Sequence, residues 1–149
     1  MIIAVDFDGT IVEHKYPAIG KQLPFAFETL RALSADGHKL ILWTVREGQL
    51  LEDAVEYCRE HGLEFYAVNS EYPNASWNGS GVSRKLRADL FIDDCNLGGL
   101  PDWSEIYEMI SHKRMRHHRS SDSKHKKRRQ NIFKKIAQKC RDARYKYSR

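Results

Sequence analysis

Short apolar runs recur along the chain and predict the strands of a sheet. Residues 2–5 are continuously apolar up to Asp6, which is typical of a strand buried on both faces of a parallel sheet. Similar runs at 40–43, 65–68 and 90–92 predict three more strands. Stretches with apolar residues at helical spacing predict three helices, which run from Pro24 to Asp36-Gly37, from Leu50 to His61 and from Trp103 to Ile110.

Strands that alternate with helices predict βαβ units, and therefore a doubly wound α/β fold on a parallel sheet. In such sheets, ligands bind outside the carboxyl ends of the strands. Asp6 follows the first predicted strand, Thr44 the second, and the pair Asp93-Asp94 the fourth. We therefore expect a ligand site at this edge. The Asn-, Ser- and Gly-rich segment 69–83 follows the third strand and is expected to be a loop that decides specificity.

Charge divides the chain into two parts. Residues 1–110 carry 9 Lys/Arg and 18 Asp/Glu, a net charge of −9, whereas residues 111–149 carry 16 and 2, a net charge of +14. We expect one folded domain over 1–110 and a basic tail over 111–149. The composition of 111–131 predicts disorder, and apolar residues at helical spacing predict a short amphipathic helix over 131–141.

The segment Asp6-Phe7-Asp8-Gly9-Thr10 places two carboxylates just past a buried strand. One carboxylate can attack a phosphorus atom, while the other protonates the leaving group and then activates water. Repulsion between them calls for a cation, and Asp93-Asp94 would add the hard oxygen ligands that Mg²⁺ prefers. An Asp-x-Asp-Gly segment alone would more simply be a solvated turn, but here other polar strand ends accompany it.

These residues resemble the haloacid-dehalogenase-like superfamily of phosphatases. Four motifs occur in its order over about residues 1–110, namely Asp6 to Thr10, Thr44, Lys85 and Asp93-Asp94. The resemblance implies a Rossmann-like core that hydrolyses phosphomonoesters through an aspartyl-phosphate. It implies that Asp6 is the nucleophile and Asp8 the general acid/base, that Thr44 hydrogen-bonds the phosphoryl group, and that Lys85, with Arg84 as the rival, pairs with its oxygens.

The same resemblance implies a Mg²⁺ site and substrate contacts. Asp6, the Asp8 backbone carbonyl and the acidic pair Asp93 and Asp94 would hold the ion. Asp94 resembles the direct ligand, with Asp93 nearby or acting through water. Contacts to the substrate are also expected from Phe7, Val45 and Arg46. Arg46 follows Thr44 by two residues, so it either binds a second anionic part of the substrate through its planar fork or is a surface residue at the start of a helix. A flap over the nucleophile would fall at Glu13–Pro17, where His14 or Lys15 would touch substrate.

The motif spacing leaves no room for an inserted cap domain. Only 35 residues separate Asp8 from Thr44 and 40 separate Thr44 from Lys85. The resemblance therefore implies a small capless phosphatase, whose open site accepts a bulky phosphorylated end or is covered by another subunit of a homo-oligomer. The phosphorylated substrate itself is not identified by the sequence.

Two other functions compete with this one. A signalling receiver domain also groups aspartates, a Thr and a Lys around Mg²⁺, but it places its Lys last, whereas Lys85 precedes the acidic pair. The basic tail favours a nucleic-acid-associated protein, or a phosphatase that acts on nucleic-acid ends, because Lys/Arg runs such as 124–129 attract polyanions.

The apolar runs and the cysteines indicate in which compartment the protein is expected. No run approaches the roughly 20 residues that span a bilayer, and Asp6 comes too early for a signal peptide. Three cysteines suit neither a disulfide framework nor a zinc cluster. We expect a soluble cytoplasmic protein with reduced thiols and no membrane partner.

Overall fold

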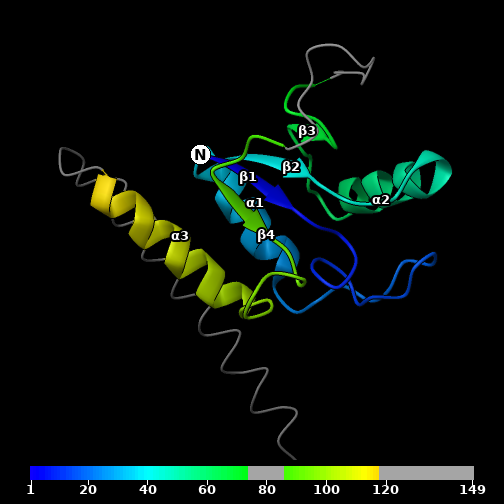
Figure 1. The fold of residues 1–149 in the computed structure, drawn as a ribbon, viewed down its shortest axis with the longest axis horizontal. Helices are drawn as coiled ribbons and strands as arrows, with labels where there is room; N and C mark the ends of the chain where they lie inside the picture. The colour runs from blue at the N-terminus through cyan, green and yellow to red at the C-terminus, as the bar shows by residue number, and fades with distance from the viewer. Residues whose placement is uncertain (74–85, 118–149) are drawn as a thin grey trace, which may run out of the picture. The chain divides into compact units, whose positions relative to one another are not determined.

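Residues 1–73 and 86–117 are described by a computed structural model of the chain (Figure 1). Contacts within the chain divide it into two units, Met1–Leu100 and Pro101–Arg149. The expected domain boundary rested on the charge reversal at residue 111, which falls inside a helix of the second unit. The assignment of 1–110 to one catalytic domain stays a prediction.

Four parallel strands form the sheet of the first unit, in the order β3-β2-β1-β4. Each lies where an apolar run predicted a strand, and the strands are β1 (Ile2–Val5), β2 (Lys39–Leu42), β3 (Ala67–Val68) and β4 (Leu90–Ile92). The predicted α/β fold with a parallel sheet is therefore confirmed, and it is compatible with a Rossmann-like core. Because β1 lies between β2 and β4, the residues that follow β1 are at the centre of the carboxyl edge.

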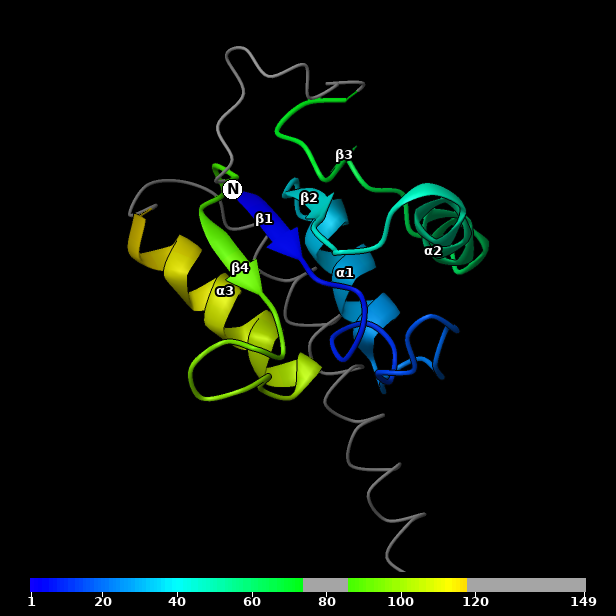
Figure 2. The same cartoon turned by 45° about the vertical axis from the view of Figure 1, so that its right-hand side comes forward.

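Two helices connect the neighbouring strands β1, β2 and β3. Helix α1 (Ala26–Ala35) joins β1 to β2, and α2 (Gly48–Glu60) joins β2 to β3. Both connections step in the same direction across the sheet, so right-handed crossovers place both helices on the same face. Figures 1 and 2 show α1 running behind β1 and β2.

The strand register explains why the apolar runs are continuous. Ala4 pairs with Ile41, and Ile41 pairs with Ala67, so these three side chains lie side by side and form a buried cluster with Leu86. Their neighbours along the strands point to the opposite face. Ile3, one such neighbour, is also fully buried, so both faces of β1 are covered, as expected for an inner strand of a parallel sheet.

Helix α3 (Trp103–His117) belongs to the second unit and is longer than predicted. The sequence predicted that the helix ends at Ile110 and that 111–131 is disordered, which is wrong for 111–117. These residues include Lys, Arg and Met, which are good helix formers, and contain neither Gly nor Pro. Basic residues at a helix C-terminus are also favoured by the helix dipole.

Two sets of predictions fall on residues outside the described ranges. One is the short helix predicted over 131–141, together with the basic run 124–129. The other is the specificity loop, of which 74–83 lies outside the structure described. Among the described residues, no helix has both the length and the apolar character needed to cross a membrane.

Candidate active site

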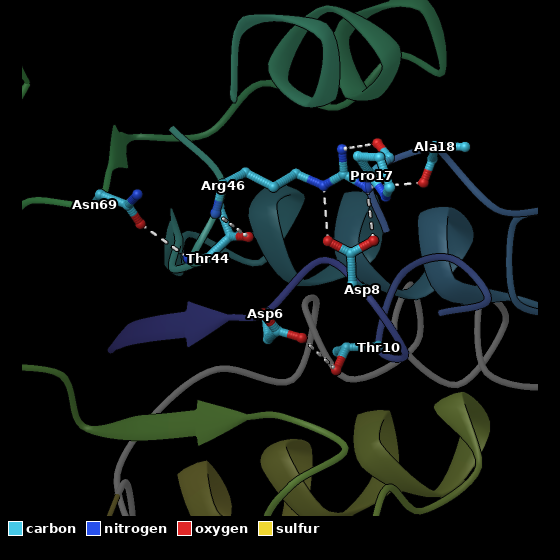
Figure 3. A network of polar contacts seen from close by, with 8 residues as sticks. All are labelled: Asp6, Asp8, Thr10, Pro17, Ala18, Thr44, Arg46 and Asn69. Carbon is cyan, nitrogen blue, oxygen red and sulfur yellow. Dashed lines mark hydrogen bonds and ion pairs between the residues drawn. The ribbon is translucent and has the colours of Figure 1, made fainter. Parts of the chain in front are cut away.

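The turn after β1 carries the two acidic residues of the predicted site. The Asp6 amide donates to the carbonyl of Ile92 in β4 at 3.0 Å, so Asp6 continues the pairing of the two strands. The chain then turns, and the Phe7 carbonyl accepts hydrogen bonds from the amides of Ile11 and Val12. Figure 3 shows that the two carboxylates diverge, with Asp6 turned toward Thr10 and Asp8 toward Arg46.

Thr10 links this turn to the acidic pair that follows β4. Its hydroxyl donates to Asp6 Oδ2 at 3.2 Å and accepts the Asp94 amide at 3.0 Å. Gly9 completes the contact, because a Cβ placed on it would lie 2.2 Å from Asp94 Oδ2. Only a residue without a side chain allows the Asp94 carboxylate to lie this close to the turn, and the φ of +88° at Gly9 also favours glycine.

The surroundings of Asp6 disfavour its charged form. The pKa of Asp6 is raised to about 6, mainly by burial and also by the negative charges of Asp93 and Asp94, which together outweigh the lowering effect of hydrogen bonds from Phe7 and Thr10. Nucleophilic and acid–base groups in active sites often have such perturbed pKa values. The acids that the sequence predicted at two strand ends are thus brought together in space.

The donor chemistry of this edge fits a divalent cation. Asp6, Asp93 and Asp94 offer carboxylate oxygens, the ligands that Mg²⁺ prefers, and their mutual repulsion would be relieved by a positive charge. The absence of a Cβ at Gly9 leaves room for the Asp94 carboxylate beside the turn that follows β1. The neighbouring thiol of Cys95 is less suited to the ion, because Asp94 raises its pKa and so favours the protonated form.

Thr44 lies two residues past β2, at the same edge of the sheet. Its amide donates to Asn69 Oδ1 at 2.8 Å, and its hydroxyl oxygen accepts the Arg46 amide at 3.3 Å. A hydroxyl that accepts through its oxygen still has its own proton to donate. Thr44 therefore keeps a proton that it can donate to a ligand, and its predicted hydrogen bond to a phosphoryl group stays a prediction.

Asp8 and Arg46 form a buried ion pair (Figure 3). The guanidinium donates through Nε to Asp8 Oδ2 and through an Nη to Asp8 Oδ1, both at 2.7 Å. These hydrogen bonds raise the pKa of Arg46. The Arg46 side chain is fully buried, so the structure gives it an internal ion pair where a substrate contact was expected.

The other predicted site residues differ in their exposure. Phe7 is fully buried, so a substrate could reach only its backbone, whereas Val45 is 84% exposed at the end of β2. Lys85 and Arg84, the two candidates for the basic residue of the site, lie outside the described residues. The choice between them stays a prediction.

Asn69 and Thr10 have structural roles at this site that were not predicted from the sequence. Asn69 follows β3 and orients Thr44, and Thr10 joins Asp6 to the segment after β4. The signal for Asn69 was a polar residue directly after an apolar run, the same signal that selected Thr44. Thr10 was part of the first motif, but its bridging role depends on a partner 84 residues away.

Comparisons with known proteins give one informative match. The chain is 64% identical to a protein from Bacteroides thetaiotaomicron whose structure is described as that of a conserved protein. The match covers 76% of this chain and 91% of that one, with a TM-score of 0.72. No protein-family model matches the chain, and a search of curated proteins gives no match.

Proposed function

We propose that this chain, which belongs to the family of the conserved protein from Bacteroides thetaiotaomicron, is a Mg²⁺-dependent phosphomonoester hydrolase of the haloacid-dehalogenase-like type. The observation that carries the proposal is the meeting of Asp6 with Asp93 and Asp94 at the carboxyl edge of a parallel sheet. Thr44, which follows the neighbouring strand, adds a hydroxyl donor at the same edge.

The metal would be held by the carboxylates of Asp6, Asp93 and Asp94. Asp8 would contribute its backbone carbonyl, since its carboxylate is paired with Arg46. When bound, Mg²⁺ would supply positive charge that offsets the repulsion between these acids and the phosphate. Asp94 is favoured as the direct ligand, because Gly9 lets its carboxylate approach the nucleophile turn, whereas Asp93 Oδ1 already accepts the Cys95 amide at 2.8 Å.

Asp6 is the nucleophile of the proposed reaction. One of its carboxylate oxygens forms a bond to phosphorus, and the bond between phosphorus and the leaving oxygen breaks, with its electron pair staying on that oxygen. The leaving oxygen takes a proton from the Asp8 carboxyl group, which would be in its protonated form for this step, with the oxygen that bears the proton released from the hydrogen bond that Arg46 donates to it. The products of this step are an alcohol and an aspartyl-phosphate on Asp6.

Water then hydrolyses the aspartyl-phosphate. The Asp8 carboxylate takes a proton from the water as its oxygen bonds to phosphorus, and the bond to the Asp6 oxygen breaks. Phosphate leaves, the Asp6 carboxylate is restored and Asp8 holds a proton for the next cycle. Thr44 donates to a phosphoryl oxygen during both steps. Lys85 is the residue expected to stabilise the negative charge that spreads over the phosphoryl oxygens in the transition state.

A capless architecture follows from the same assignment. Helix α1 and strand β2 take 14 of the 35 residues between Asp8 and Thr44, and the 21 that remain are too few for an additional domain. An uncovered site accepts a phosphate on a bulky molecule as readily as one on a small metabolite. The substrate class must therefore be found by assay.

The test is a panel of phosphomonoesters assayed with and without Mg²⁺. The panel contains an aryl phosphate, sugar phosphates, nucleotides and oligonucleotides phosphorylated at the 3′ or 5′ end. Asp6→Asn keeps the shape of the side chain and removes the attacking charge, so turnover should fall by several orders of magnitude. Asp53→Asn, at an exposed position on α2, is the matched control and should retain activity.

Two results contradict the proposal. One is wild-type protein that releases no phosphate from any member of the panel in the presence of Mg²⁺. The other is undiminished turnover in Asp6→Asn, which would mean that the activity does not pass through this carboxylate.

A further inference from the structure

Arg46 is the largest fully buried side chain of the described residues, and its guanidinium makes four hydrogen bonds. Two go to the Asp8 carboxylate at 2.7 Å. The other two go to the backbone carbonyls of Pro17 and Ala18, each at 2.9 Å. A guanidinium has five N–H donors, so almost the whole donor capacity of Arg46 is directed at two short segments of the chain.

These bonds connect three segments that the sequence keeps apart. Asp8 lies in the turn after β1, Pro17 and Ala18 lie in the loop that leads to α1, and Arg46 follows β2. The Arg46 amide also donates to the hydroxyl oxygen of Thr44, at 3.3 Å. Arg46 therefore contacts the proposed acid/base Asp8, the proposed hydrogen-bond donor to the phosphoryl group Thr44 and the loop that contains Pro17 and Ala18 (Figure 3).

Aromatic rings restrict the guanidinium further. Its carbon lies 5.1 Å from the centre of the Phe7 ring and 5.3 Å from the centre of the Tyr16 ring. Both distances are within the range of cation–π attraction. Phe7 is fully buried, whereas Tyr16 is 49% exposed, so the loop residue next to Arg46 reaches solvent.

We infer that Arg46 is a positioning residue, which holds the Asp8 carboxylate in its working orientation and ties the loop 16–18 to it. This inference rests on the proposed function, since it assumes that Asp8 transfers protons. A planar fork can bind a carboxylate through two parallel hydrogen bonds and still reach two carbonyls, whereas a lysine ammonium is a point charge. A buried ion pair is weak evidence for stability in itself, which favours a role in fixing geometry.

The kinetic test separates proton transfer from the rest of the reaction. A 4-nitrophenolate leaving group needs no proton, whereas an alkoxide does, so loss of the Asp8 orientation should affect the two differently in the first step. In Arg46→Lys, the first turnover of an alkyl phosphate should slow by about 100-fold, within the range that general acid catalysis contributes. The rate of the first turnover of 4-nitrophenyl phosphate should change by less than about threefold. The later turnovers should be slower than the first.

A fast first turnover followed by a slower steady state appears as a burst of 4-nitrophenolate. A merely structural defect would not produce this burst. The burst reports an aspartyl-phosphate that forms normally and is hydrolysed slowly, because the same carboxylate must activate water. In the Asp8→Asn background, Arg46→Lys should add less than about a twofold further loss, since the two residues act as one unit. Arg59→Lys, at an exposed position on α2, is the control and should match the wild type.

Hydrogen exchange gives a second readout that does not depend on activity. In Arg46→Lys, the backbone amides of the loop around 16–18 should exchange at least tenfold faster, while those of α2 keep their rates. If Arg46→Lys does not fold, Tyr16→Ala replaces it, because it removes a ring beside the guanidinium without touching the ion pair. Tyr16→Ala should then show the same selective loss with alkyl phosphates, and Tyr16→Phe should not.

The outcomes distinguish this inference from the proposed function. An inactive wild type on the whole panel overturns the proposed function, and the inference with it. An active wild type whose Arg46→Lys variant, or Tyr16→Ala in its place, loses the same factor on both leaving groups overturns the inference alone. Unchanged exchange in the loop around 16–18 also overturns it.

Discussion

Asp6→Asn should stabilise the metal-free protein at neutral pH, although it removes the proposed nucleophile. Burial, with Asp93 and Asp94 nearby, raises the pKa of Asp6 from 3.8 to about 6, so the fold disfavours the charged carboxylate. Asparagine has no charge to disfavour, and its side-chain oxygen can still accept the hydrogen bond that Thr10 donates. Such tension between stability and activity is common at active sites.

The magnitude follows from the two pKa values. Between pH 4 and pH 6, the native state retains a proton on Asp6 that the unfolded chain has released. The native state then binds more protons, so stability falls as pH rises through this window and stays low above it. The difference between 3.8 and about 6 corresponds to about 3 kcal/mol, and solvent screening of the partly exposed carboxylate reduces this to about 1–2 kcal/mol.

The assay is urea denaturation of wild type and variant with EDTA, at pH 8 and at pH 4. At pH 8, Asp6→Asn should have the larger free energy of unfolding, by about 1–2 kcal/mol. At pH 4 the difference in the free energy of unfolding between variant and wild type should nearly vanish. At pH 8, added Mg²⁺ should reduce this difference, because it stabilises the wild type. Asp53→Asn, which is exposed on α2, should show no such pH-dependent gain.

A clear result refutes this reasoning. If Asp6→Asn is no more stable than wild type at pH 8 without metal, the carboxylate is not disfavoured by its surroundings. A gain that is equal at pH 4 and pH 8 would mean that it does not come from the charge of Asp6.

Three other predictions concern the Asp8–Arg46 ion pair, the space that Gly9 leaves for Asp94, and the choice between Asp93 and Asp94 as metal ligand. Arg46→Met leaves a buried carboxylate without its counter-charge and should lower the free energy of unfolding by about 3–5 kcal/mol in urea denaturation; a loss below about 1 kcal/mol would contradict this. Gly9→Ala should weaken Mg²⁺ binding at least tenfold by calorimetry, whereas Gly37→Ala, at a similar φ with no atom within 4 Å, should not. Asp94→Asn should raise the Mg²⁺ concentration needed for half-maximal activity more than Asp93→Asn does, and equal shifts would count against Asp94 as the direct ligand.

Local sequence determined the strands and the placement of most of the candidate acids. A strand buried on both faces must be apolar at every position, so the run 2–5 was readable without knowledge of its partners. Parallel strands bring their carboxyl ends to one edge, so polar residues after separate runs predicted a shared site. The end of α3 was misjudged, because the charge change at residue 111 was taken as a structural boundary, although basic residues are good helix formers.

Tertiary structure decided which partner each polar side chain takes. Asp8 and Arg46 are 38 positions apart, and the amide of Thr44 is bound by Asn69, 25 positions away. Neither contact follows from periodicity, because periodicity tells which face a residue lies on and not which side chain of another segment it meets. The side chain of an arginine is long enough to place its guanidinium either in solvent or in the protein interior. The carbonyls of Pro17 and Ala18, together with the Asp8 carboxylate, hold it inside, and only the folded chain brings them together.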